Sequence, residues 1–139
     1  MVLDLDLTEH SIHHARRMLV EGVRMWGLEE LASDLGLVVT ELLTNTMLHA
    51  LGPDGAAVGR ARCLVQRVPS GLVAVVHDED PRLPEGRRGD VDALGGRGLH
   101  IVRQLAANVA ITPSPGGGKD VVVMLSGAPY VLAADGVAA

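Results

Sequence analysis

Apolar and polar positions follow one another along the chain with two different periods, and each period predicts one type of element. Residues 2–7 alternate apolar and acidic side chains, which is typical of a short, half-exposed strand. Thr8 then begins a helix that runs to about Met25 and ends before Gly27. The inner face of this helix is expected to consist of Ile12, Ala15, Met18, Leu19 and Val23. The chain therefore starts with a strand and an amphipathic helix.

A second, longer helix is predicted from residues 28–30 to Ala50, with a kink at Gly36. Turn-forming residues at 51–55 end it. The apolar stripe of this helix is formed by Leu35, Val38, Val39, Leu42 and Leu43.

A row of polar side chains runs beside that stripe. Glu41, Asn45 and His49 are spaced four residues apart, so they share one edge of the helix with a drift of roughly 40° per step. Asn lowers helix stability and gains nothing in mid-helix unless its amide has a partner. This spacing alone is compatible with a solvent-facing row and with one wall of a binding site.

Two strands are predicted next, at residues 58–68 and 72–77, joined by a Pro-Ser-Gly turn at 69–71. Alternation places Asp78 on the same face as Ala74 and Val76, at the end of a very apolar strand. Such a carboxylate either turns out into solvent or serves a site, and the pattern does not decide between the two.

Residues 79–96 lose all periodicity and are rich in Pro, Gly, Arg and Asp. A long stretch of this kind in a compact domain is usually functional, so we expect a lid. Three arginines in it, Arg82, Arg87 and Arg88, either contact an anion or only contribute to solubility.

Glycines then lead directly into a third helix. Gly95, Gly96 and Gly98 precede or accompany its first turn, and Leu99 begins its apolar face. Glycine lets the backbone approach a ligand closely, and a helix N-terminus offers N–H groups to an anion. The alternative is a flexible helix entry without a ligand. No strand directly precedes these glycines and a third one is missing, so this is not a dinucleotide-binding fingerprint.

The chain ends with a predicted hairpin of residues 109–112 and 121–125, followed by a small-residue tail. The glycines and lysine at 116–119 do not form a P-loop, because no Ser or Thr follows the lysine and a strand comes next. We therefore expect a single domain over residues 1–139, with its core at about 7–125 and a tail at 126–139.

Composition narrows the class of protein. With 47% hydrophobic and 21% charged residues, the chain is typical of a soluble globular protein. A net charge of −5 and the near-absence of aromatic residues argue against direct binding of nucleic acid, and no apolar run is long enough to span a membrane. The single cysteine, Cys63, excludes an internal disulfide and is expected in the core. A cytoplasmic location is expected because no signal-peptide pattern is present.

Four phrases together resemble a known superfamily. They are ELLTNTMLHA at 41–50, VVHDEDPRLP at 75–84, GGRGLHIVRQLA at 95–106 and GGGKDVVVML at 116–125. In this order they resemble the histidine kinase-like (GHKL, or Bergerat) ATPases, and within them the anti-sigma-factor serine kinases. The resemblance implies an α/β two-layer sandwich, with a mixed, mainly antiparallel sheet and three helices on one face.

The resemblance also implies roles for the polar row. Glu41 would be the catalytic general base that polarises the attacking hydroxyl. Asn45 would bind Mg²⁺ through its side-chain oxygen, which is the kind of ligand that a hard cation prefers. His49 stands at the place of a basic residue that reaches the phosphates of ATP.

The remaining roles implied by the resemblance concern the nucleotide. Asp78 would accept a hydrogen bond from the exocyclic amine of adenine. Gly96, Gly98 and Leu99 would hold the triphosphate with backbone N–H groups, and Arg97 could add positive charge. Such a site transfers a phosphoryl group mainly by positioning and by neutralising charge.

The chain departs from the family pattern in two places. The usual Asp-x-Gly-x-Gly is replaced by Asp-Glu-Asp-Pro-Arg at 78–82, although the later proline is kept as Pro84. Asp120 stands where a threonine is expected, and we expect this to weaken the hydrogen bonds around Asp78. These departures leave kinase turnover less secure than nucleotide binding.

The leading hypothesis is an ATP-binding anti-sigma-type serine/threonine kinase that binds a sigma factor and phosphorylates an anti-sigma-factor antagonist. The resemblance further implies a homodimer formed through the N-terminal strand and first helix. The alternative is a regulatory module of the same fold that acts by protein contact, with weak nucleotide binding or none. The catalytic half of a histidine kinase and a helix-turn-helix DNA-binding protein fit less well, because the chain has no room for dimerisation helices and lacks a basic recognition helix.

Overall fold

The computed structural model describes residues 1–49, 59–79 and 97–127, and these form five strands and three helices. The elements follow the order predicted from the sequence. In chain order they are β1 (Val2–Asp6), α1 (Glu9–Met25), α2 (Glu29–His49), β2 (Arg60–Val68), β3 (Gly71–Asp78), α3 (Arg97–Leu105), β4 (Asn108–Pro113) and β5 (Lys119–Ser126).

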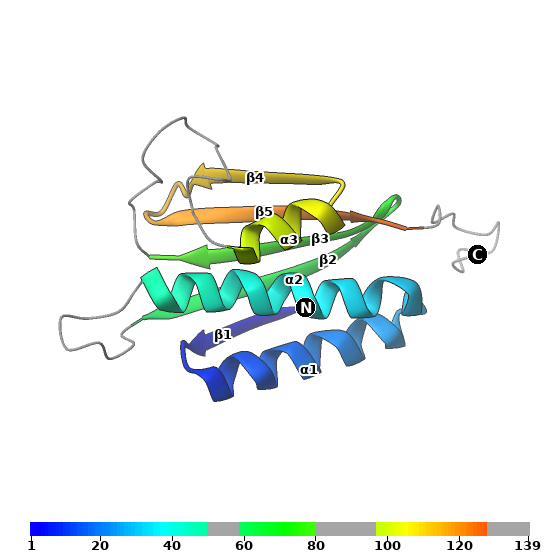
Figure 1. Cartoon of the computed structure of the whole chain (residues 1–139), viewed down its shortest axis with the longest axis horizontal. Coiled ribbons are helices and arrows are strands. Elements are labelled where there is room, and N and C mark those ends of the chain that lie inside the picture. Colours follow the sequence, from blue (N-terminus) through cyan, green and yellow to red (C-terminus); the bar gives the residue numbers. More distant parts are fainter. Residues whose placement is uncertain (50–58, 80–96, 128–139) are drawn as a thin grey trace.

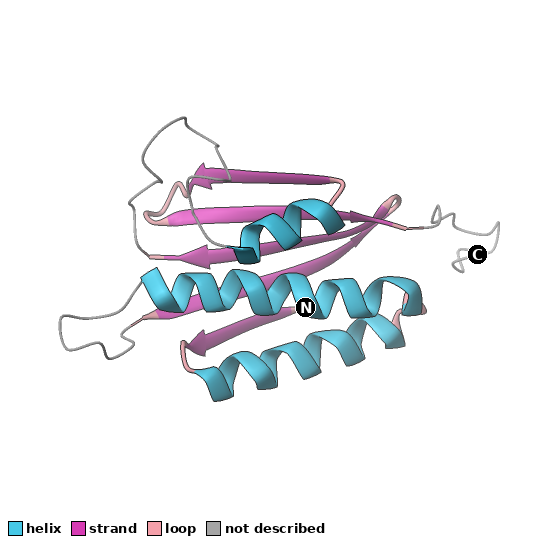
Figure 2. Ribbon diagram, in the orientation of Figure 1, coloured by secondary structure: helices cyan, strands magenta, loops and turns pink. Residues whose placement is uncertain are grey.

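The strands form one sheet in the order β1-β2-β3-β5-β4, and every neighbouring pair in it is antiparallel. All three helices lie on one face of this sheet, with α2 between α1 and α3 (Figure 1). Figure 2 shows the same two layers, helices in front of strands. The predicted two-layer sandwich is confirmed, and the described sheet is wholly antiparallel rather than mixed.

The core lies between the helices and the inner face of the sheet. In β3, every second residue from Leu72 to Asp78 is buried, while Val73, Val75 and His77 are only half-buried. β5 repeats the pattern, with each second residue from Lys119 to Leu125 buried. The predicted face of Asp78 is therefore confirmed, and this carboxylate points toward the helices instead of into solvent.

The predicted start and end of the first helix are confirmed, but the predicted position of one side chain, Met18, is wrong. Thr8 caps α1 through a capping box with Ser11, and Gly27 follows its end with a φ of 81°. Met18, predicted on the inner face, is 47% exposed. It neighbours the buried Leu19, and one residue turns an α-helix by about 100°, which carries Met18 past the edge of the buried stripe.

The kink predicted at Gly36 is wrong. α2 runs as one helix from Glu29 to His49, and its ribbon shows no sharp bend (Figure 1). The glycine serves packing instead, because a Cβ at this position would lie only 2.9 Å from Cγ2 of Val20 in α1. Gly36 therefore lets the first two helices approach closely.

The predicted strands are all present. β1 and β2 are slightly shorter than predicted, and β3, β4 and β5 are slightly longer. Several predictions fall outside the described residues: the end of the second helix at Ala50 with its turn at 51–55, the lid at 79–96 beyond Glu79, and the tail beyond Gly127. In the described ranges, no helix combines the length and apolar character that crossing a bilayer requires.

Cys63 lies in the core, as predicted, on the inner face of β2 and with an exposed fraction of 0%. Burial raises the pKa of its thiol to about 12, since the thiolate would lose its hydration. We predict that Ellman's reagent at pH 8 leaves the native protein unmodified and reacts with one thiol per chain in denaturant. Rapid modification of the native protein would contradict this packing.

Candidate functional site

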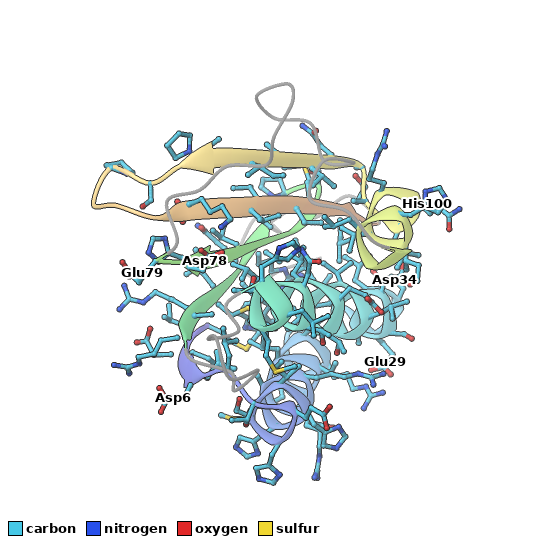
Figure 3. The ribbon with its side chains drawn as sticks, turned by 60° about the vertical axis from the view of Figure 1, so that its left-hand side comes forward. Asp6, Glu29, Asp34, Asp78, Glu79 and His100 are labelled. Atoms are coloured by element: carbon cyan, nitrogen blue, oxygen red, sulfur yellow. The ribbon has the colours of Figure 1, made fainter. Side chains whose placement is uncertain are left out.

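The polar row of α2 faces away from α1 and toward α3. Thr40, Thr44 and Met47 line a groove shared with α1. Asn45 is two residues before Met47, which is a rotation of about 200°, so it lies on the opposite side of the helix. Asp34, seven residues before Glu41 and therefore on nearly the same side, lies beside α3 in Figure 3.

The side chains of this row differ in burial. Glu41 and Asn45 are half-buried, whereas His49 is exposed in the last turn of α2. Within the described part of the chain, no hydrogen bond or ion pair is recorded for any of the three. A half-buried carboxylate and amide without such partners are groups that a ligand can satisfy. The sequence spacing did not decide between a solvent-facing row and a site, and in the structure the row lies on the side of α2 that faces α3.

The third helix contributes its N-terminus. α3 begins at Arg97, and its first turn is directed toward the end of the molecule at which α2 and β3 both terminate (Figure 1). Leu99 and Val102 are buried, which fixes this turn against the core. Gly96 lies outside the described residues, and for Arg97 and Gly98 only the helical backbone is described.

A buried ion pair lies where β3 ends. Asp78 and Lys119 are directly opposite in the β3–β5 ladder, and both point to the helix-covered face. The Nζ of Lys119 donates to Oδ1 of Asp78 at 3.0 Å, and the two residues are only 7% and 5% exposed. Burying two charges is tolerated because each neutralises the other.

The turn before β5 makes this pairing possible. Gly118 has a φ of 75°, a conformation that residues with a side chain disfavour, and a Cβ there would clash with the backbone oxygen of Asp78. The turn between β4 and β5 therefore approaches the end of β3 closely only because this residue is glycine.

Asp120 lies on the other face of the sheet. Its Oδ1 is 2.6 Å from Nδ1 of His77, its partner across the ladder, and Oε1 of Glu79 is 3.2 Å from the other ring nitrogen. Figure 3 shows Glu79 at the outer side of the sheet, away from Asp78. The expectation that Asp120 alters the surroundings of Asp78 is therefore wrong, because Lys119 has that position.

The imidazole of His77 is held between these two acids. Burial alone would lower its pKa, but the hydrogen bonds and negative charges of Asp120 and Glu79 outweigh burial and raise it. A protonated imidazole donates to both carboxylates at once. The outer face thus carries a charge cluster directly behind the buried pair.

The inner-face arrangement suits a nucleotide with its cation. The amide oxygen of Asn45 is a hard ligand, of the kind that Mg²⁺ takes alongside phosphates and water. The N-terminus of α3 favours anions, and Asp78 offers an acceptor at the end of the sheet. In the described residues no group of three metal-ligating side chains occurs.

Comparison with known proteins agrees with this fold. A family model of the histidine kinase-like ATPase domain matches residues 5–125, and the chain belongs to this family. No curated protein sequence matches the chain.

Two solved structures share the fold. One is the histidine kinase domain from the blue-light activated histidine kinase of Erythrobacter litoralis EL346, with a TM-score of 0.55 and 23% identity over 83% of this chain. The match spans 60% of that domain's length. The other is the SiaB–SiaC complex from Pseudomonas aeruginosa, with a TM-score of 0.56, 12% identity, and coverage of 88% of this chain and 87% of the other. Identities this low establish the shared fold alone.

Sequence reasoning missed Lys119. The sequence motif relates this lysine only to a phosphate loop, and that match fails. Alternation through Lys119, Val121, Val123 and Leu125 would have placed it on the core face, where an ammonium needs a buried acid. Asp78, predicted on the same face, was the available partner.

We predict that Lys119→Met destabilises the protein by about 3–5 kcal/mol, because it leaves the Asp78 carboxylate buried opposite an apolar side chain. The double variant Lys119→Met/Asp78→Leu should recover much of this loss. Urea denaturation monitored by circular dichroism measures both.

The control for this prediction is the exposed pair between Arg62 and Asp4, whose Nε and Oδ1 are 2.8 Å apart. Its loss in Arg62→Met should matter far less, since solvent screens it. If Lys119→Met and Arg62→Met lowered the free energy of unfolding equally, burial would not strengthen the ion pair of Lys119.

The His77 cluster predicts a pH dependence. The two acids raise the pKa of His77 in the folded state. The stabilisation that this implies is fully present below the pKa of an unfolded-state histidine, about 6.5, and it is lost as pH rises through the folded-state pKa. Asp120→Asn should therefore cost more stability at pH 5.5 than at pH 8.5 in urea titrations. His14→Gln, on the exposed face of α1, should show no such trend. A cost that grows with pH would reverse the assigned sign.

Proposed function

We propose that this protein is an ATP-binding serine/threonine kinase of the anti-sigma type, which requires Mg²⁺. The observation that carries the proposal is the half-buried Glu41 and Asn45 on the α3 side of α2, with Asp78 at the end of β3. Membership of an ATPase-domain family supports it independently.

In the proposed site Glu41 is the catalytic base, and Asn45 holds the cation through its side-chain oxygen. His49, in the last turn of α2, reaches out toward the phosphates. When bound, Mg²⁺ neutralises phosphate charge. Because Glu41 and Asn45 are one helical turn apart, a rigid helix fixes the distance between base and cation.

The rest of the proposed site, at the end of β3 and the start of α3, binds the nucleotide. Asp78 accepts a hydrogen bond from the base, and the backbone at Gly96, Gly98 and Leu99 contacts the phosphates, with Arg97 adding charge. Burial of Leu99 supports this role, because it anchors the first turn of α3. Anchored N–H groups stabilise phosphate charge without having to reorient.

The proposed reaction transfers the γ-phosphoryl group to a protein hydroxyl. The hydroxyl oxygen bonds to the γ-phosphorus while the bond to the β–γ bridging oxygen breaks, and ADP leaves. Glu41 accepts the hydroxyl proton. The acceptor is a serine or threonine of an anti-sigma-factor antagonist, and a sigma factor is the second partner.

Partner binding has separate support. The solved structure in which one chain shares this fold is that of the SiaB–SiaC complex, an assembly of two proteins. In this chain the proposed homodimer would use β1 and α1, where β1 is an edge strand of the sheet. Edge strands leave backbone groups available for pairing with another chain. We place the protein in the cytoplasm, where a sigma factor acts.

A second candidate function is favoured by one observation. Lys119 already binds the oxygen of Asp78 that adenine would otherwise approach, which suits a regulatory module without kinase activity. Calorimetry with Mg-ADP separates the two. Absence of heat at millimolar ligand would remove nucleotide binding, and with it the kinase, and would leave the module.

We predict that Glu41→Gln lowers the phosphoryl-transfer rate roughly 10²- to 10⁴-fold, because the base is lost, with Mg-ADP affinity nearly unchanged. The assay incubates the protein and its cognate antagonist with Mg-ATP and measures phosphoserine. Asn45→Ala should weaken Mg-nucleotide binding as well.

The matched control is Glu30→Gln, an exposed acid in the first turn of the same helix, which should behave as wild type. A Glu41→Gln variant that transfers phosphate at the wild-type rate would falsify the assignment of the base.

A further inference from the structure

The outer face of the sheet, opposite the helices, carries a row of apolar side chains that crosses all five strands of the described sheet. We propose that this face binds a second copy of the chain, sheet against sheet, about a two-fold axis that runs along β3. The surface differs from the one formed by the edge of β1 and by α1, to which the homodimer was assigned above. Its use does not depend on nucleotide binding.

Strand register defines the apolar row. Each strand contributes one apolar residue to a continuous line of cross-strand partners, namely Val2, Leu64, Val75, Val122 and Ala110. Val2 is 54% exposed and the other four are half-buried. The solvated face of an antiparallel sheet is ordinarily polar, and the helices of the described chain all lie on the opposite face (Figure 1). An apolar strip of this width on an uncovered face indicates an interaction surface.

Two further rows of cross-strand partners flank the apolar row. The row on one side adds two apolar side chains and consists of Gln66, Val73, Met124 and Asn108. The row on the other side is mostly charged and consists of Asp4, Arg62, His77, Asp120 and Thr112. The outer face thus has an apolar half and a charged border.

The order of charges in this border selects a second copy as the partner. A two-fold axis along β3, the central strand, places each row on the same row of the other copy with the strand order reversed. Arg62 of each copy then faces Asp120 of the other, and Asp4 faces the uncharged Thr112. His77 lies on the axis, where its bonds to Asp120 and Glu79 offset the charge of its ring.

The same axis packs the apolar row on itself. Val75 faces Val75, and Leu64 of each copy faces Val122 of the other. Sheets that pack face to face keep their strands within about 30° of each other, which is compatible with an axis parallel to the strands. An axis across the strands would instead place the charged border on the apolar half, and unpaired charges buried against apolar groups disfavour that arrangement.

The face is hollowed, which leaves room for side chains of a second copy. A cavity of about 490 Å³ is lined by Leu64 and Val75 from the apolar row, by Arg62 from the charged border, and by the turn before β5 at Ser114 and Gly116. Inner side chains of two packed sheets interdigitate, so a hollow between rows suits this kind of partner.

The size of the face predicts a weak dimer. Strands about 4.8 Å apart and rows about 7 Å apart give the three rows an area of roughly 500 Å² on each copy, or roughly 1,000 Å² in all. This area is at the lower limit for a specific interface, so we expect a dissociation constant on the order of micromolar.

The first test measures association of the full chain by sedimentation velocity at roughly 1–500 µM, a range that brackets this weak affinity. The wild type should associate as concentration rises. Val75→Asp places two carboxylates opposite each other on the axis and should raise the dissociation constant by roughly 100-fold or more. The control is Leu37→Glu, which replaces an exposed apolar residue of α2 and should behave as wild type. Association that remains in Val75→Asp belongs to another surface.

The second test exchanges charges between copies. Arg62→Asp and Asp120→Arg should each associate poorly alone, because each variant sets like charges opposite one another. An equimolar mixture of the two should associate, since both facing pairs are then of opposite charge. This comparison also serves if Val75→Asp does not fold, and circular dichroism verifies that each variant is folded.

The third test locates the axis by cross-linking with a short bis-maleimide. Val75→Cys should form covalent dimers, because the two positions face each other across packed sheets about 10 Å apart. Thr112→Cys, on the outer face of the edge strand β4, should not, because the axis places its two copies on opposite sides of the interface. The native Cys63 is fully buried and does not compete for the reagent.

Three results would overturn the proposal. One is a wild type that stays monomeric over the whole range, and another is equal association of wild type and Val75→Asp. The third is a mixture of the charge variants that associates no better than either variant alone. Equal cross-linking of Val75→Cys and Thr112→Cys would overturn the axis along β3. None of these outcomes bears on nucleotide binding, which calorimetry measures separately.

Discussion

The antiparallel register between β3 and β5 determines the chemistry on both faces of the sheet. It pairs Asp78 with Lys119 and His77 with Asp120. Since successive side chains alternate between faces, the first pair is buried under the helices and the second lies on the outer face. A slip of one residue would exchange these positions and bury His77 in place of Asp78. Gly118 allows the close approach that this register needs.

The helix layer assembles the other half of the site. α2 is packed against α1 on one side, where Gly36 removes the bulk of a side chain, and lies beside α3 on the other. Glu41 and Asn45 border the second of these sides. Their partial burial follows from this position, because they are too close to α3 for full exposure and too far from the sheet to join the core. Elements distant in sequence thus come together on this side of α2.

Membership of the histidine kinase-like ATPase family and the local geometry carry different parts of the functional argument. The family explains why a helix edge, a strand end and a helix N-terminus converge. The particular residues add a buried ion pair, since Lys119 brings a positive charge to the carboxylate of Asp78. The proposed kinase and its alternative diverge at this ion pair, which makes it the most informative contact in the molecule.

Local periodicity in the sequence by itself determined the elements, their order and the inward face of Asp78, because hydrophobic spacing records which side of an element is buried. It also identified the row of Glu41 and Asn45 as a continuous edge. Only the tertiary structure decided which neighbours these faces meet. The spacing could not show that Gly36 contacts α1, or that Lys119 rather than Asp120 reaches Asp78. Those facts depend on helix packing and strand register, which are set by contacts between residues far apart in the chain.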